Sequence, residues 1–127
     1  MARTAAELGE EDLDVYRHTA RLRERRERKE WVQRLTDAMA LARRAADLLR
    51  ERFGAKRVVV FGSLVREGCF TPWSDVDLGA WGLDPADTFR AIGVVHTIDP
   101  NIEINLVDVN ACSPSLLALI EAEGRDL

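Results

Sequence analysis

The sequence Lys56-Arg-Val-Val-Val-Phe-Gly-Ser63, then eleven residues, then Asp75-Val-Asp-Leu-Gly-Ala-Trp-Gly82, decides the fold of this chain. Val58 to Phe61 is a continuous β-branched and aromatic run, typical of a strand buried on both faces, and a Gly-Ser pair ends it abruptly. The second apolar run starts directly after an Asp-x-Asp pair. We therefore expect strands over residues 57–61 and 76–81, with a short helical turn and a loop between them.

Polar residues stand where these strands begin and end. Residues two apart in a strand project to the same face, so Asp75 and Asp77 would aim both carboxylates at one point. A helix that begins at Ser63 would offer unpaired backbone N–H groups and a hydroxyl to an anion. Two neighbouring carboxylates repel each other unless a cation lies between them, and Mg²⁺ is commonly held by carboxylates, phosphate oxygens and water. The pattern indicates a site for a magnesium-bound triphosphate, although each motif alone is more often ordinary turn chemistry.

Phe61-Gly62-Ser63 followed by Ser74-Asp75-Val76-Asp77-Leu78 resembles the hG[GS]…DxD motif of the nucleotidyltransferase superfamily, which includes DNA polymerase beta and kanamycin nucleotidyltransferase. The short length and the tail Ile102-Glu-Ile-Asn-Leu-Val-Asp-Val109 look like the minimal nucleotidyltransferases, small prokaryotic proteins often paired with a HEPN-domain partner as toxin and antitoxin. The resemblance covers residues 31–127, and residues 1–30 form a separate charged helical arm. It implies an α/β nucleotidyltransferase fold, with a small mixed β-sheet of about three strands flanked by helices.

The same resemblance implies roles for single residues. Gly62 and Ser63 would bind the phosphates of an NTP, expected to be ATP, and Arg66 would clamp them. Asp75 and Asp77 would hold Mg²⁺. The implied activity is transfer of AMP to a hydroxyl, with a tyrosine of a HEPN toxin as the acceptor that the family suggests, and the chain would act as the antitoxin.

The third acidic residue that this family carries is replaced here. Asn105 stands where that acid is expected, and an amide has no basic role. Glu103 shares its strand face about 6.6 Å away and is our candidate substitute, whereas Asp108 projects from the opposite face. If Glu103 does not serve, transfer would be slow or absent, because the general base and one metal ligand are missing. The alternative function is then an inactive antitoxin that neutralises its partner by binding.

Charge is distributed unevenly along the chain. The net charge is −4, but residues 1–57 hold 15 basic and 11 acidic side chains, and residues 58–127 hold 3 and 11. Such asymmetry often reflects partners rather than fold. The acidic N-terminus lacks the apolar core of a secretory signal, and no apolar run approaches the roughly 20 residues that cross a bilayer. Cys69 and Cys112 form no CxxC pair, and a cytoplasmic protein with free thiols is expected.

Residues 1–14 are acidic, and we expect them to form a weakly ordered lead-in. Tyr16 to Glu30 is rich in arginine and good helix formers but polar all round, which is typical of a solvated helix or one that docks on a partner. A homo-oligomer contact is equally open. Nucleic-acid binding by the arginines is a third function, but the interleaved glutamates disfavour it.

The remaining elements follow from periodicity and caps. Apolar residues spaced three and four apart predict an amphipathic helix over 31–53, ended by Gly54. Further helices are expected over 84–96, with Phe89, Ile92 and Val95 buried, and over 114–123, and a strand is expected over 102–109. In the loop before the Asp-x-Asp pair, Trp73 favours a packing cover over a base-stacking platform.

Overall fold

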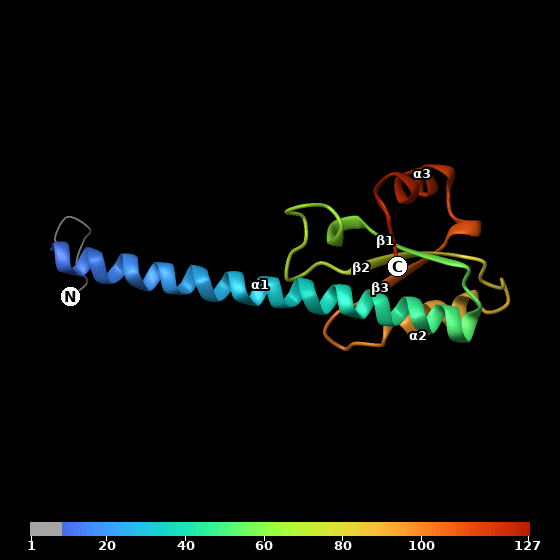
Figure 1. Cartoon of the computed structure of the whole chain (residues 1–127), viewed down its shortest axis with the longest axis horizontal. Coiled ribbons are helices and arrows are strands. Elements are labelled where there is room, and N and C mark those ends of the chain that lie inside the picture. Colours follow the sequence, from blue (N-terminus) through green and yellow to red (C-terminus); the bar gives the residue numbers. More distant parts are fainter. Residues whose placement is uncertain (1–8) are drawn as a thin grey trace. The chain divides into compact units, whose positions relative to one another are not determined.

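The computed structural model of the chain describes residues 9–127 (Figure 1). Its contacts divide the chain into two units, with the boundary between Gln33 and Arg34. The helices and strands are α1 (Glu10–Phe53), β1 (Arg57–Phe61), β2 (Val76–Trp81), α2 (Thr88–His96), β3 (Ile104–Asp108), α3 (Pro114–Glu123) and β4 (Arg125–Asp126), with 3-10 turns at Gly62–Leu64 (η2) and Val109–Ala111 (η3).

The four strands form one mixed sheet in the order β3-β2-β1-β4. β1 is antiparallel to both β2 and β4, and β2 is parallel to β3. In this register Asp77 lies opposite Phe61 on one side and Asn105 on the other. The α/β fold class and the strands over 57–61 and 76–81 are confirmed. The two-residue β4 was not predicted, because it has no apolar signal of its own.

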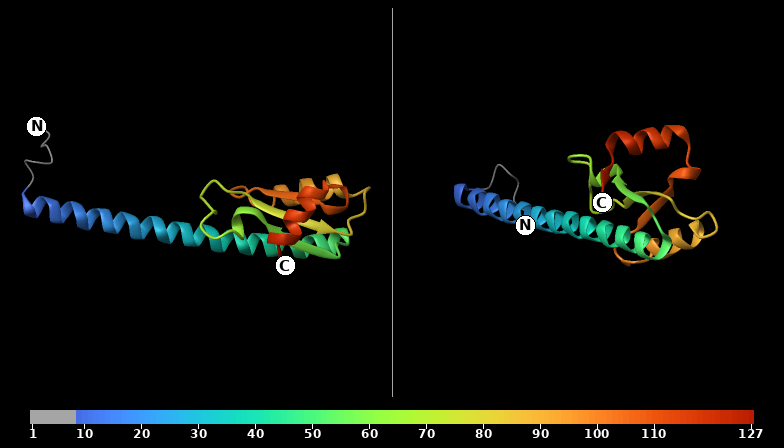
Figure 2. Two further views of the ribbon diagram at one scale, coloured as in Figure 1. Left: turned by 90° about the horizontal axis from the view of Figure 1, so that it is seen from above. Right: turned by 45° about the vertical axis from the view of Figure 1, so that its right-hand side comes forward.

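Helices cover both faces of the sheet, and β1 is buried between them. Its side chains alternate: Val58 and Val60 join the larger core under α1 and α2, whereas Val59 and Phe61 join a smaller cluster under α3. Figures 1 and 2 show α3 on the side of the sheet opposite to α2. Burial on both faces explains why β1 reads as an unbroken apolar run rather than an alternating one.

α1 is one continuous helix, and Gly54 ends it in the left-handed conformation (φ +68°). Small residues such as Ala42 and Ala45 are fully buried in the part from Arg34 onward, as the amphipathic pattern predicts. The expected weakly ordered lead-in is wrong for residues 10–14, which are already helical. Three acidic residues in this first turn stabilise the helix, because their negative charges interact favourably with the positive N-terminal end of the helix dipole. Residues 1–8 of that lead-in lie outside the described residues.

Two expected boundaries are corrected. α2 begins at Thr88 rather than at residue 84, because the Asp84 carboxylate accepts a hydrogen bond from the Ala86 backbone N–H (2.9 Å) and closes a turn. Ala91 and Val95 then face the core, one turn apart, and Phe89 points away and is 87% exposed, not buried. β3 begins at Ile104, two residues later than expected.

The last helix is confirmed. The Ser113 hydroxyl accepts a hydrogen bond from the Leu116 backbone N–H (3.2 Å), and Pro114 opens α3 as the sequence predicts.

Cys69 and Cys112 are both free thiols. Within residues 9–127, no helix combines the length and apolarity that spanning a membrane requires.

Candidate functional site

The turn after β1 brings backbone directly against a carboxylate. Gly62 adopts φ +78°, and a Cβ built on it would lie 2.5 Å from Asp77 Oδ2, so only glycine allows this approach. The short helical turn expected after β1 is present as η2, a single 3-10 turn that begins at Gly62, and the Gly62 carbonyl accepts from the Val65 and Arg66 N–H groups. Any anion would therefore be held by the turn itself and not by a helix dipole.

Asp75 and Asp77 lie at the start of β2, beside Asn105 of β3. The Asn105 amide nitrogen donates to Asp75 Oδ2 (3.3 Å) and to Asp77 Oδ1 (3.4 Å). The parallel register that pairs Asp77 with Asn105 places these groups on one face. The structure thus brings together the Asp-x-Asp pair, Asn105 and the Gly62 turn.

Asp77 is electrostatically the most perturbed residue of this group. Burial raises the pKa of its carboxyl above the ordinary 3.8, and the neighbouring Asp75 charge raises it further. The hydrogen bond from Asn105 and the positive charge of Arg66 oppose both effects on this pKa. A half-buried anion next to a second anion is a place where a cation or a proton is favoured.

The charge of Arg66 lowers the pKa of the Asp77 carboxyl, but the guanidinium group of Arg66 is paired with another residue, Glu123. Its Nε donates to Glu123 Oε2 of α3 at 3.0 Å. Both side chains are partly exposed. The loop that follows the Gly62 turn is therefore tied to the last helix through the guanidinium group.

Glu103 is not joined to the aspartate pair as a third carboxylate. It precedes β3, where its backbone carbonyl accepts from the Val76 N–H (2.9 Å), and its side chain lines a groove with Trp73 and Asp75. Over residues 9–127, no three His, Cys, Asp or Glu side chains gather in a way that could hold a metal ion. Asp108 is engaged elsewhere, since it accepts from the Thr88 hydroxyl (3.1 Å) and the Asn110 N–H (3.1 Å).

The donors fit a hard divalent cation that is only partly coordinated by protein. Asp75 and Asp77 supply two carboxylates on one face, and the hydrogen bonds between their side chains and Asn105 are long, at 3.3 and 3.4 Å. Mg²⁺ is commonly bound by one or two carboxylates, with phosphate oxygens and water completing its shell. The set matches that requirement when a nucleotide brings the remaining oxygens.

Trp73 corrects a second expectation. It is 90% exposed and is therefore not a packing cover. The loop around it is ordered by side chains, because the Thr71 N–H donates to the Ser74 hydroxyl (2.9 Å) and the Trp73 N–H donates to the Thr71 hydroxyl (3.3 Å). The Thr71-Pro-Trp-Ser74 sequence predicts this local turn, since hydroxyl residues near a proline favour such side-chain turns, but it does not predict the exposure of Trp73.

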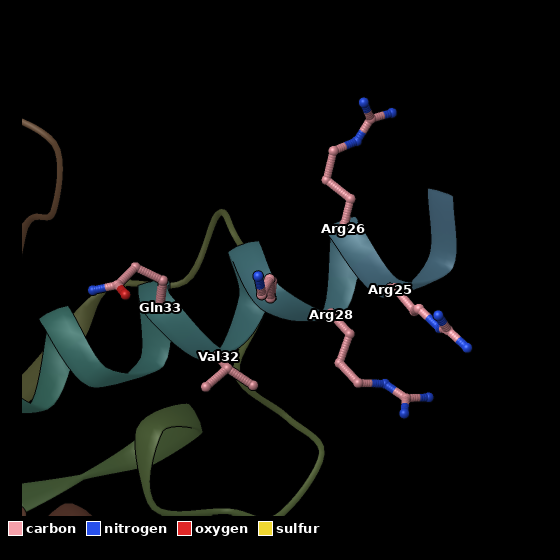
Figure 3. Close-up of a pocket in the computed structure, with 6 residues that line it drawn as sticks. Arg25, Arg26, Arg28, Val32 and Gln33 are labelled. Carbon is pink, nitrogen blue, oxygen red and sulfur yellow. The ribbon is translucent and has the colours of Figure 1, made fainter. Parts of the chain in front are cut away.

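The arginine-rich part of α1 carries a hollow of about 740 Å³ lined by Arg25, Arg26, Arg28, Lys29, Val32 and Gln33. Figure 3 shows that Arg25, Arg26 and Arg28 leave the helix in different directions. Diverging guanidinium groups do not converge on a single anion. This segment therefore presents no converged set of guanidinium groups for one phosphate.

Comparisons with known proteins bear on the fold that holds these residues. Residues 42–96 match the family model described as "Nucleotidyltransferase domain". No curated protein sequence matches the chain. The toxin–antitoxin complex MntA-HepT shares the fold at 17% identity and a TM-score of 0.53, over 69% of this chain and 69% of that chain.

Two further solved structures are similar. A toxin–antitoxin complex with AMP-PNP is 21% identical, with a TM-score of 0.54 over 64% of this chain and 67% of that chain. A tri-AMPylated Shewanella oneidensis HEPN toxin in complex with an MNT antitoxin gives 18% identity and a TM-score of 0.53, over 70% of each chain.

Residues 42–96 are therefore similar to a nucleotidyltransferase domain, and the chain has the fold of these solved structures. The family match spans the Gly62-Ser63 turn, Arg66 and the Asp75–Asp77 pair, and it stops before β3. More particularly, the solved structures that it resembles are toxin–antitoxin complexes, one of them a HEPN toxin with an MNT antitoxin. The resemblance noted in the sequence is thus confirmed for the fold.

Proposed function

We propose that this protein is a Mg²⁺-dependent nucleotidyltransferase that moves AMP from ATP to a hydroxyl group. The observation that carries the proposal is the packing of the Gly62 turn against Asp77, beside a second carboxylate on the same face. A phosphate chain placed over this turn would lie next to both acids. Mg²⁺ would neutralise the charge that develops on the phosphate oxygens during transfer.

The chain's own residues have defined roles in this proposal. Gly62 and Ser63 bind the β- and γ-phosphates, Arg66 clamps them, and Asp75 and Asp77 hold the metal. The acceptor oxygen attacks the α-phosphorus, the bond to the bridging β-phosphate oxygen breaks, and pyrophosphate leaves with that electron pair. We assign the acceptor proton to Glu103, the carboxylate that lines the groove beside Asp75.

We further propose that the acceptor lies on a HEPN-domain toxin and that its modification silences the toxin, which makes this chain a cytoplasmic antitoxin. Two observations support this: similar structures include an AMPylated HEPN toxin with its antitoxin and a toxin–antitoxin complex with AMP-PNP. Transfer is assigned to residues 31–127. The charged arm over residues 1–30 is left to contacts with a partner or a second copy.

Asn105 favours a second candidate function. It replaces the third carboxylate with a neutral amide that already bonds both aspartates. A chain that binds Mg·ATP but lacks an efficient base would neutralise its toxin by complex formation alone. The two functions predict different products from the same mixture.

The test is to incubate the protein with ATP, Mg²⁺ and a candidate HEPN-domain partner, and to measure the intact mass of that partner. An added AMP that disappears with Asp77→Asn supports transfer. A tight complex without added mass supports the binding function. Asp47→Asn is the matched control, because Asp47 is an exposed carboxylate on α1, where it forms an ion pair with Arg50 at 3.7 Å.

Nucleotide binding is measured separately by calorimetry. Asp75→Ala should weaken Mg·ATP binding by at least about tenfold, the usual scale for removing a charged partner. The melting temperature should stay close to wild type, because this side chain takes no part in the buried core. Unchanged affinity in a folded Asp75→Ala variant would refute the proposed site.

A further inference from the structure

A groove of about 500 Å³ opens beside the carboxylate pair. Its lining includes Arg34, Pro72, Trp73, Pro100 and Glu103, together with Asp75. The volume lies within the range typical of ligand sites. Asp75 belongs both to the lining of this groove and to the carboxylate pair. A group bound in the groove would therefore lie next to the proposed metal-binding carboxylates.

The Gly62 turn and the groove lie against different members of the carboxylate pair. Asp77 Oδ2 abuts the turn, whereas Asp75 lines the groove. In an in-line phosphoryl transfer, the entering oxygen and the leaving pyrophosphate lie on opposite sides of the reacting phosphorus. If the β- and γ-phosphates occupy the turn, the entering oxygen approaches from the groove.

The groove walls select the chemistry of the occupant. Asp75 and Glu103 place two carboxylates against one cation, Arg34, which disfavours the phosphate backbone of a nucleic acid. Trp73 presents an almost fully exposed ring, and burying such a ring is a common source of affinity at protein interfaces. Arg34 is held at the wall by its hydrogen bond to the Asn101 carbonyl (3.0 Å).

We infer that this groove is the acceptor site and that it takes a hydroxyl-bearing polypeptide segment, packed on Trp73 with its hydroxyl directed toward Asp75. This inference rests on the proposed transferase function and adds the place where the acceptor binds. It also assigns Trp73 to acceptor recognition rather than to binding of the nucleotide base.

Trp73→Ala separates these roles, and Phe89→Ala is a matched control, since Phe89 is an equally exposed aromatic residue on α2 outside the groove. Mg·ATP affinity is measured by calorimetry, and the KM for the HEPN partner is measured from its AMP mass gain. We expect Trp73→Ala to raise the acceptor KM at least about tenfold, the scale of an interface hot spot, with Mg·ATP affinity within about twofold of wild type. Phe89→Ala should change neither quantity.

Other outcomes overturn the inference. Weaker Mg·ATP binding with an unchanged acceptor KM would place the nucleotide base in the groove, and no change in either quantity would show that the groove is not a subsite. Loss of binding to a fluorescein-labelled single-stranded oligonucleotide in Trp73→Ala, with the partner KM intact, would replace the polypeptide with a nucleic acid.

Failure of the transferase proposal itself is recognised by wild-type protein that adds no mass to its partner. The groove is then judged in the complex with a photocrosslinking residue, p-benzoylphenylalanine, placed at position 73 or at position 89. Crosslinking to the partner from position 73 alone supports the polypeptide site. No crosslink from position 73, or equal crosslinking from both positions, overturns it.

Discussion

Asn105 lies directly opposite Asp77 in the parallel pairing of β2 and β3, and its amide nitrogen is 3.4 Å from Asp77 Oδ1. The same nitrogen is 3.3 Å from Asp75 Oδ2. One neutral donor thus moderates the repulsion between two acids. A carboxylate at position 105 would do the reverse, because it would add a third negative charge at the same point.

Asn105→Asp should therefore have opposite effects with and without metal. In EDTA we expect a loss of about 1–2 kcal/mol in the free energy of unfolding, because three acids repel each other. With Mg·ATP we expect tighter binding and faster AMP transfer. Thermal melting in both buffers and the partner's mass gain measure these effects, and a variant that is equally stable in EDTA would contradict the electrostatic account.

Gly62→Ala tests the contact between the turn and Asp77. Alanine at φ +78° costs about 1–2 kcal/mol in backbone strain, and its methyl group would also displace the Asp77 carboxylate. Gly68→Ala is the matched control, because Gly68 has φ +73° and open space around its Cβ position. Both variants should lose similar stability by chemical denaturation, but only Gly62→Ala should lose Mg·ATP binding. Equal affinities in the two would show that the contact is not needed.

Asp77 gives the domain a predictable pH dependence. Its pKa is raised in the folded state above the ordinary 3.8, so the folded protein binds this proton more tightly than the unfolded chain. The resulting stability is fully present below pH 3.8 and is lost as the pH rises through the folded-state pKa. Asp77→Asn cannot ionise, so without metal it should melt at a higher temperature than wild type at pH 7. The gap should close toward pH 4, and a lower melting temperature at pH 7 would refute this.

Glu123 should affect binding more than stability. Its ion pair with Arg66 is partly exposed, and such pairs contribute about 0–1 kcal/mol to folding. Because the pair positions the guanidinium group near Asp77, Glu123→Gln should weaken Mg·ATP binding about two- to fivefold, and Arg66→Ala should weaken it more. In the Arg66→Ala background, Glu123→Gln should have no further effect. An additive loss in calorimetry would show that Glu123 acts independently of Arg66.

Two glycines outside the site predict opposite changes in stability. Gly93 lies within α2 with open space at its Cβ position, so Gly93→Ala should stabilise the fold by about 0.5–1 kcal/mol. A Cβ on Gly124 would collide with Val59 and with the Ile120 carbonyl, so Gly124→Ala should cost about 2 kcal/mol or more. Urea unfolding of both variants at pH 7 measures the difference, and a shift of the same sign in both would contradict the packing of α3 and β4 on β1.

The strongest local patterns predicted most of the fold. The unbroken apolar run of β1 and the Ser113-Pro114 start of α3 are confirmed because burial and capping act through neighbouring residues. The start of α2 was misplaced because a side-chain turn at Asp84 competes with the helix, and sequence alone does not rank the two. β4 was missed because a strand of two residues depends wholly on its partner strand.

In the candidate site too, some features could be predicted from local sequence and others depend on the tertiary structure. The spacing of Asp75 and Asp77 fixes their common face, so their proximity was predictable. The hydrogen bonds of Asn105 and the ion pair of Arg66 with Glu123 join residues far apart in the chain, and only tertiary structure reveals them. The exposure of Trp73 was unpredictable for the same reason, since no local pattern shows whether a loop aromatic finds a core.

The strand pairing that unites Asp77 with Asn105 has a consequence for how the protein tolerates change. Neighbours of Asp77 on β2, Val76 and Leu78, are fully enclosed, and strand side chains alternate between faces. A shift of β2 by one residue would turn the aspartates toward the hydrophobic core and Val76 toward solvent. The same strand register thus buries Val76 and Leu78 and places Asp77 beside Asn105. A molecule with an intact core therefore has its aspartate pair on the correct face of the sheet.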